Sequence, residues 1–425
     1  MYNAYLKPFL KKIKRSLTAD VTKLNLASPR FYFYDETEKS DLLIFDDFLP
    51  DLLGSWRAVE LSAYLKEFDK AKLICFLSFY NEKYKSLQFE EDKKLFVEKF
   101  GIRAKEQSIC RIDHSRPINI NTKLAYCLFY HNIRSIYPVL EKYQVPFVFT
   151  LFPGGDFAFY NKECDAFLKK ISASPLLKKI IVTQQSTYNY LVDRKIFTED
   201  QLALIFGGCF PTSKYQLKGK KTYYKRDRAA LNICFVSGKY IDHGLDKGFD
   251  IFCHTAYKLC KKYNFIKFHV VGNFTKDDLM FEIAADKIFF YGIQGFEWFA
   301  DFYADKDVII SPVRPFVLQR GAFDGFPTGG TVDAALYGVL MMSSDPLEDN
   351  SLAGFSDWND MIIAESNSVS IINAIEKLIE KPSLIESIAN SGQKKCLAVY
   401  SEEEQIQPRI KLLKETIKKI CNGFS

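Results

Sequence analysis

Short apolar runs alternate with amphipathic segments along most of the chain. The runs at residues 42–48, 72–77 and 147–151 are rich in Leu, Ile, Val and Phe, and the segment 58–68 has apolar residues at helical spacing. Strands of a parallel sheet are apolar on both faces because helices cover both, and strand, loop, helix and strand form a βαβ unit. The pattern predicts an α/β fold built from such units.

The alternation occurs twice. A polar stretch at residues 213–228, rich in Lys and Tyr with almost no aliphatic residues, separates the two occurrences. We therefore predict a first domain at residues 1–212, a linker at 213–228 and a second domain at 229–399. Two doubly wound sheets in tandem would leave a crevice at the carboxyl ends of their strands, where open α/β sheets bind ligands.

The expected elements follow from these periodicities. In the first half we expect strands at 30–34, 42–48, 72–77, 125–130, 147–151, 178–183 and 204–211, and helices at 58–68 and 136–143. In the second half we expect strands at 231–238, 266–272, 288–292, 307–311 and 339–343, and helices at 251–263, 297–304, 368–380, 382–399 and 402–421.

Composition agrees with a folded protein of two domains. The 425 residues are 48% hydrophobic and 26% charged, which is enough apolar content for two cores and argues against disorder. The net charge of +6 is modest, so no nucleic-acid partner is expected. Basic residues gather at 7–15 and 218–228, and both clusters could meet an anionic surface.

The sequence contains no pattern typical of a metal site or a membrane span. Ten cysteines are scattered without a Cys-x-x-Cys pair, and the five histidines lack metal-ligand spacing, so we expect reduced cysteines and no built-in metal. The longest apolar stretches, such as 145–152, are far shorter than the roughly 20 residues that cross a bilayer. No signal-peptide core stands at the N-terminus, so we expect a cytoplasmic protein.

The strongest candidate for chemistry is a Gly/Pro/Thr loop between the expected strands 307–311 and 339–343. An aspartate stands on each side of it, Asp324 and Asp333, and an alanine-rich helix follows. Glycines let backbone N–H groups approach an anion, and a helix N-terminus adds its positive dipole end. The loop therefore predicts a diphosphate site with carboxylates beside it for sugar hydroxyls; its donors would be Thr328, Gly329, Gly330 and Thr331.

Further candidates lie at expected strand ends and helix starts. In the second half, Lys239 after Gly238, Lys247 and Arg314 could supply positive charge to a diphosphate. In the first half, two loops could touch phosphate or acceptor, and His131 could make a polar contact; the loop residues are Gly54, Ser55 and Arg57, and Gly154, Gly155 and Asp156.

Each candidate also has an ordinary structural explanation. Lysines are usually solvated, the glycines could serve simple turns, and Arg314 and His131 could be structural. Asp333 could act as a cap or as an acid that favours the helix dipole.

The second half resembles the retaining, nucleotide-sugar-dependent glycosyltransferases of GT-B fold, in particular the group 1, or family 4, enzymes of bacterial surface-glycan assembly. Four short motifs typical of the family occur in the same order along this chain: Gly238-Lys239, Lys247-Gly248, Val270-Val271-Gly272 and Asp324-Gly325-Phe326. Residues 288–312 and 400–405 are similar to further family segments. The resemblance covers about residues 40–420 and is most specific between 235 and 340.

The resemblance implies two Rossmann-like domains that face each other across a crevice, with residues 400–425 as a closing helix that crosses back to the first domain. It places the hexose-binding acid at Asp324 and the ribose-binding acid at Asp333, with Gly325 and Phe326 in the donor loop. It implies transfer of a hexose, with retention, from a UDP- or GDP-sugar to a glycan or lipid-linked acceptor. No permanently bound cofactor and no metal would be required.

The chain departs from the family at three places. The family has two glutamates separated by seven residues, whereas Asp324 and Asp333 are aspartates separated by eight. Phe152 and Pro153 stand where a histidine often follows a first-domain strand, and Lys239 replaces an arginine. These departures leave open a non-catalytic, glycosyltransferase-like partner subunit; a nucleotide-sugar epimerase or phosphorylase of the same fold is the other alternative.

The first sixteen residues alternate apolar and basic side chains at helical spacing. Such a helix could rest on an anionic membrane leaflet, which would make the protein peripheral on the inner face of the cell membrane. A solvated helix packed on the first domain is the alternative interpretation.

Overall fold

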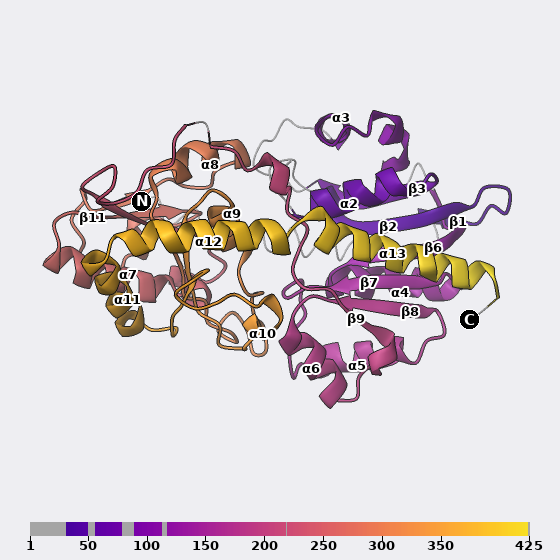
Figure 1. The fold of residues 1–425 in the computed structure, drawn as a ribbon. Coiled ribbons are helices and arrows are strands. Elements are labelled where there is room, and N and C mark those ends of the chain that lie inside the picture. Colours follow the sequence, from indigo (N-terminus) through magenta and orange to yellow (C-terminus); the bar gives the residue numbers. More distant parts are fainter. Residues whose placement is uncertain (1–30, 50–55, 79–88, 113–116, 218, 424–425) are drawn as a thin grey trace, which may run out of the picture.

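The computed structural model describes residues 31–49, 56–78, 89–112, 117–217 and 219–423 (Figure 1). In the described ranges the chain forms two large parallel sheets, one from each half, and a small sheet of two strands. The N-terminal segment 1–16 lies outside the described residues.

The first sheet has seven parallel strands in the order β4-β3-β2-β6-β7-β8-β9. Its strands are β2 (Ser40–Leu49), β3 (Ala71–Ser78), β4 (Ile109–Arg111), β6 (Thr122–Leu128), β7 (Phe147–Leu151), β8 (Leu177–Val182) and β9 (Leu202–Leu204). The helices of this half are α2 (Trp56–Glu67), α3 (Phe89–Lys99), α4 (Tyr130–Lys142), α5 (Lys162–Ser172) and α6 (Gln185–Asp193). The order of the strands reverses between β2 and β6, as in doubly wound folds.

The second sheet repeats this topology with six parallel strands in the order β12-β11-β10-β13-β14-β15. Its strands are β10 (Leu231–Val236), β11 (Ile266–Val271), β12 (Ile288–Phe290), β13 (Val308–Ser311), β14 (Leu340–Ser343) and β15 (Ile362–Ile363). Its helices are α7 (Phe249–Lys262), α8 (Phe296–Phe302), α9 (Gly329–Leu336), α10 (Asn350–Ala353), α11 (Ser368–Glu380) and α12 (Ser383–Val399). The reversal here lies between β10 and β13.

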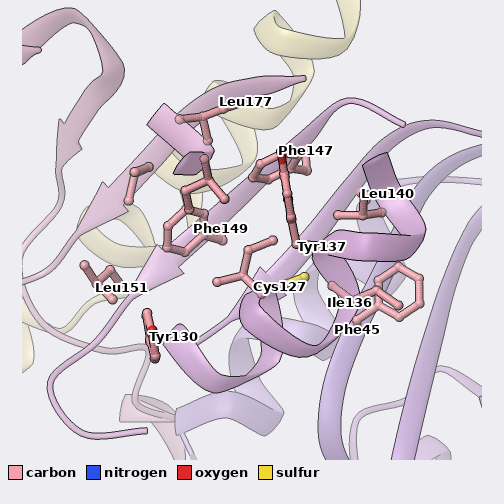
Figure 2. Packing of buried hydrophobic residues seen from close by; sticks show 14 of the residues in the cluster. Phe45, Cys127, Tyr130, Ile136, Tyr137, Leu140, Phe147, Phe149, Leu151 and Leu177 are labelled. Atoms are coloured by element: carbon pink, nitrogen blue, oxygen red, sulfur yellow. The ribbon is translucent and has the colours of Figure 1, made fainter. Parts of the chain in front are cut away.

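Uniformly apolar strands are buried because helices cover them. Figure 2 shows the side of the first sheet under α4, where the ring of Tyr137 lies 5.8 Å from that of Phe147 of β7; Ile136, Leu140 and Phe149 belong to the same core cluster. All of these side chains are at most 2% exposed. Burying a large apolar side chain contributes roughly 1.5–3 kcal/mol, so this layer is a main source of stability for the first domain.

The last helix, α13 (Glu402–Cys421), crosses from the second half to the first (Figure 1). Ser401 separates it from α12 and accepts a hydrogen bond from the backbone N–H of Glu404. In α13 Arg409 is fully buried, donates to the carbonyl of Gly207 at 2.9 Å and lies 4.0 Å from Glu60 of α2. The closing helix is therefore fastened to the first sheet by a buried cation.

Several expected elements differ in the structure. The strand expected at 30–34 is only the two-residue β1 (Tyr32–Phe33), which pairs with β5 (Ile118–Asn119) outside the main sheet. The prediction of a strand at 204–211 was wrong beyond Leu204, because the chain turns at Gly207 (φ +73) against the ring of Tyr400.

Other differences concern helices. Helix α4 begins at Tyr130, earlier than expected, because Phe129 turns the chain sharply at φ 68 directly after β6. Helices α3, α5, α6 and the short α10 were missed, as were the short strands β4 and β15. For α5 the signal was local, since Asn161 caps it by accepting from the backbone N–H groups of Glu163 and Cys164.

The expected linker contacts the second sheet closely. Tyr223 and Tyr224 are buried, and the backbone N–H of Thr222 donates to the carbonyl of Ala304 at 3.0 Å. The positions at which one domain ends and the other begins stay a prediction.

Candidate functional site

A crevice with a free volume of about 160 Å³ lies between the two sheets and is open to solvent. It is lined by loops from both halves and by Tyr400 of the segment that joins α12 to α13. The first half contributes Trp56, Phe152, Pro153, Thr183, Gln184, Gly207, Gly208 and Phe210, and the second half contributes 324–329.

Lys247 and Asp324, named separately from the sequence, form an ion pair. The Lys247 Nζ donates to both carboxylate oxygens of Asp324, at 2.6 and 2.7 Å. Asp246 lies 3.5 Å from the same amine. Burial opposes the charged amine, but the Asp324 carboxylate outweighs it and raises the pKa of Lys247. A buried lysine whose charged form is favoured thus stands beside a carboxylate that is one third exposed at the crevice.

The backbone before α7 holds this lysine close to the loop after β13. Gly248 has φ +70, and a Cβ there would lie 2.1 Å from the carbonyl oxygen of Pro312, so only glycine fits. Arg314 donates to the carbonyl of Leu245 at 2.8 Å and to Asp250 at 2.8 Å. The structural explanation therefore accounts for these contacts of Arg314, which fasten the two loops together.

Lys239, after Gly238 at the end of β10, has a separate partner. Its Nζ donates to both oxygens of Asp278 at 2.8 Å, and its backbone N–H donates to Asn273 at 2.6 Å. The ring of Tyr240, which sequence reasoning missed, lies 5.0 Å from the Lys247 Nζ. The two candidate lysines are thus each neutralised by their own aspartate.

Helix α9 begins in the glycine loop, as expected. Thr328 is its N-cap, but the Thr328 side chain accepts no hydrogen bond from a backbone N–H of the first turn; its hydroxyl instead pairs with the hydroxyl of Thr331 at 2.8 Å. The helix start touches the end of β10, because a Cβ on Gly330 would lie 3.0 Å from the carbonyl oxygen of Val236. The uncapped N–H groups of Gly329 and Gly330 therefore lie at the strand reversal.

Asp333 lies in the second turn of α9, so it is not the cap of that helix. Its carboxylate accepts a hydrogen bond from the hydroxyl of Tyr215, whose ring packs between Phe296 and Tyr337. Burial raises the pKa of Asp333 to about 7, although the Tyr215 hydrogen bond acts in the opposite direction. Sequence reasoning missed Tyr215, since 118 positions separate the two residues.

The donor loop also reaches the first domain. The backbone N–H of Phe326 donates to the side chain of Gln184 at 3.3 Å, and a Cβ on Gly325 would lie 3.0 Å from the same side chain. Nearby, Ser186 donates its backbone N–H and its hydroxyl to Asp349, at 2.7 and 2.9 Å. These contacts join the two halves of the chain beside the crevice.

The reversal point of the first sheet holds a charged cluster. Arg57 lies 3.0 Å from Asp46 and 2.6 Å from Asp47, and His131 lies 3.0 Å from Asp47. Burial raises the pKa of Asp46, whereas at Asp47 the close approach of His131 and the Arg57 guanidinium outweigh burial and hold the pKa well below its usual range. Two acids inside the apolar run 42–48 were the missed signal.

The turn at 154–156 packs against this cluster. Gly154, Gly155 and Asp156 all have positive φ, and a Cβ on Gly155 would lie 2.7 Å from the Nδ1 of His131. The carbonyl of Gly155 accepts from the backbone N–H of His131 at 3.1 Å. The structure thus brings together Arg57, His131 and the glycine turn, while Gly54 and Ser55 lie outside the described residues.

Among the described residues, no group of three or more His, Cys, Asp or Glu side chains could hold a metal ion. Within those same ranges, no helix has both the length and the apolar character needed to cross a membrane.

The sequence matches no protein-family model, and no curated protein matches it. Solved structures do match over nearly the whole chain. A glycosyltransferase from Rickettsia africae ESF-5 is 14% identical, with a TM-score of 0.59 over 90% of this chain and 99% of that chain. HepE from Anabaena in complex with UDP-glucose is 13% identical, with a TM-score of 0.58 over 89% of this chain and 99% of that one.

A third match is sucrose-phosphate synthase from Thermosynechococcus elongatus, 13% identical with a TM-score of 0.55 over 91% of this chain and 100% of that one. Identities this low establish the fold alone. The fold is GT-B, with two Rossmann-like domains that face each other across a crevice and a C-terminal helix that crosses back.

Proposed function

We propose that the protein is a glycosyltransferase that moves a hexose from a UDP- or GDP-sugar to a glycan or lipid-linked acceptor in surface-glycan synthesis. The observation that carries the proposal is that Asp324, which is paired with the buried Lys247, lines the crevice together with the uncapped start of α9 at Thr328 and Gly329. The complex of HepE with UDP-glucose supports a nucleotide-sugar donor for a chain of this fold.

The chemistry follows from charge. Breaking the anomeric C–O bond leaves negative charge on the departing diphosphate, so preorganised cations and N–H dipoles accelerate the step. In this proposal Lys247 and the N–H groups of Gly329 and Gly330 bind the diphosphate, Asp324 accepts from hexose hydroxyls and Asp333 from the ribose. Transfer with retention, without a metal, rests on the sequence resemblance.

One specific observation favours a second candidate, a non-catalytic partner subunit. The charge of Lys247 is already neutralised by Asp324, that of Lys239 by Asp278, and Asp333 already accepts from Tyr215. A protein that no longer binds a donor would retain such internal pairs.

Donor binding separates the two candidates. We expect one class of nucleoside diphosphate sugar to raise the Tm, since a ligand at 100 times its Kd stabilises by about 2.7 kcal/mol. Asp333→Ala should lose this shift, whereas Lys258→Ala, an exposed lysine on α7, should keep it. No shift with any UDP- or GDP-sugar, and none with free UDP or GDP, would favour the partner subunit. If a donor binds, NMR of the anomeric proton of the product shows whether transfer proceeds with retention or inversion.

The pH dependence of donor binding should report on Asp333. Ribose hydroxyls donate best to the ionised carboxylate, so affinity should be constant above pH 7 and fall about tenfold per unit below it. Tyr215→Phe removes a hydrogen bond that favours the ionised form, and should therefore move this midpoint to higher pH. Tyr337→Phe is the control, because that ring packs on Tyr215 at 5.1 Å without donating to Asp333. An identical profile in wild type and Tyr215→Phe would refute this role.

A further inference from the structure

The loop after β13 carries three consecutive exposed apolar side chains. Phe316, Val317 and Leu318 are 41%, 39% and 43% exposed, and Tyr160 of the first domain is 58% exposed. The rings of Phe316 and Tyr160 both lie 6.4 Å from that of Phe159, so they border one site from opposite halves of the chain. We call these four side chains the apolar tip. Runs of exposed apolar residues are costly unless they serve an interaction.

The apolar tip is held in place by the loop that bears it. The backbone N–H of Phe316 donates to the carbonyl of Ala322 at 2.6 Å, which closes the loop into a short turn. The residue before it, Gly321, accepts from the backbone N–H of Phe159 at 2.9 Å, and a Cβ on Gly321 would lie 1.8 Å from the carbonyl oxygen of Phe159. The turn therefore rests directly on the first domain.

An anchor side chain completes the attachment. Phe323 is only 6% exposed and belongs to the core cluster of the first domain, where its ring lies 4.3 Å from Phe159 and 6.1 Å from Phe157. Phe323 buries its ring while Phe316 exposes its own, although a single loop carries both. Residues 316–318 are thus exposed even though their loop is anchored to the first domain.

Two arginines stand beside the apolar tip. Arg320 is exposed in the same turn, and residues 312–323 contain no acid. On the other side, the Arg194 guanidinium lies 5.6 Å from the ring centroid of Tyr160 and is 45% exposed, with its ion-pair partner Asp165 at 3.4 Å. Apolar side chains flanked by arginines match the interface of an anionic bilayer, where the rings enter the headgroup region and the guanidinium groups meet phosphates.

We propose that the apolar tip docks the protein on a bilayer that contains anionic phospholipid. The loop that carries the tip continues directly into Asp324 at the crevice. Docking would therefore bring the crevice close to a membrane in which a lipid-linked acceptor could reside. This site differs from the N-terminal segment 1–16, and it goes beyond the proposed transferase activity.

Sedimentation of the full chain with vesicles tests the proposal. Wild type should sediment with vesicles of phosphatidylcholine and phosphatidylglycerol, and less with phosphatidylcholine alone. The triple variant Phe316→Ser, Val317→Ser, Leu318→Ser should bind about tenfold more weakly or worse. The matched control replaces three exposed apolar residues elsewhere, Met280→Ser, Val369→Ser and Leu397→Ser, which are 49%, 64% and 41% exposed, and should bind as wild type does.

Two single variants test the proposal in case the triple variant does not fold. Arg320→Glu should weaken binding to the anionic vesicles alone, and Tyr160→Ser should weaken binding to both kinds. Thermal unfolding shows whether the triple variant is folded. If it is folded and still sediments as wild type does, docking occurs elsewhere and the proposal is wrong. It is equally wrong if wild type binds neither vesicle, or if the tip mediates only self-association in the absence of lipid. No donor is present, so these outcomes leave the proposed transfer reaction untouched.

Discussion

Lys247→Ala is expected to lower kcat/KM for the nucleotide sugar by about 10²–10³-fold, the usual cost of removing one preorganised donor at a developing charge. Lys247 is buried beside the loop after β13, and two carboxylates, Asp324 at 2.6 Å and Asp246 at 3.5 Å, keep it charged. Water cannot easily replace an amine held in this way. The loss should appear mainly in kcat, because diphosphate charge grows in the transition state.

A double-mutant cycle shows whether Lys247 and Asp324 act together. Asp324→Asn removes the negative partner, and the effects of Lys247→Ala and Asp324→Asn should not add, because the two side chains share two hydrogen bonds. Lys258→Ala, on the exposed side of α7, is the control for loss of a lysine in this region. Full activity of Lys247→Ala would show that the diphosphate binds elsewhere.

Asp307→Asn is expected to lower the free energy of unfolding by about 3 kcal/mol, the cost of breaking a buried ion pair. Asp307 is fully buried before β13, where it accepts from the backbone N–H groups of Tyr224 and Asn232, both at 2.8 Å, and pairs with Arg228 at 2.7 Å. Both carboxylate oxygens accept hydrogen bonds from these donors. In asparagine one of the oxygens becomes an NH₂ group, which cannot accept, so at least one donor would lose its partner. Arg228 would also lose its counter-charge.

Urea unfolding followed by circular dichroism measures this loss. The matched control is Asp286→Asn, since that carboxylate is 75% exposed and lies 3.7 Å from Lys287; a change within about 0.5 kcal/mol is expected there. Asp307 lies at the amino ends of the strands, away from the crevice, so donor affinity of the folded variant should not change. A stability equal to wild type would mean that the buried carboxylate contributes no net stabilisation.

Two helices that combine a capping side chain with a regular apolar repeat were predicted well from the sequence. The expected helices at 368–380 and 402–421 coincide with α11 and α13, because each has a capping side chain, Asn367 or Ser401, directly before a regular apolar repeat. By contrast α4 was misplaced at its start, since the turn at Phe129 depends on how β6 ends against its neighbours rather than on local preference.

The candidate site was predictable in its parts but not in its pairings. The glycine loop before α9 and the lysine before α7 carry local signals, and both lie at the crevice or beside it. Nothing in the sequence indicated that Lys247 would contact Asp324, 77 positions away, or that Asp333 would accept from Tyr215. Such pairs form where loops from different strands converge at the reversal of strand order.

The sequence by itself determined the alternation of strands and helices, the two repeated sheets and the positions of glycines, because apolar periodicity and turn chemistry act over a few neighbouring residues. Only the tertiary structure decided which charges face one another and which apolar side chains stay exposed. The reason is that the order of strands in a sheet, and the docking of one domain's loop on the other, bring together residues whose separation along the chain carries no information about their distance in space. Asp47 beside Arg57 and His131, and Phe323 buried in the first domain's core, are the clearest cases.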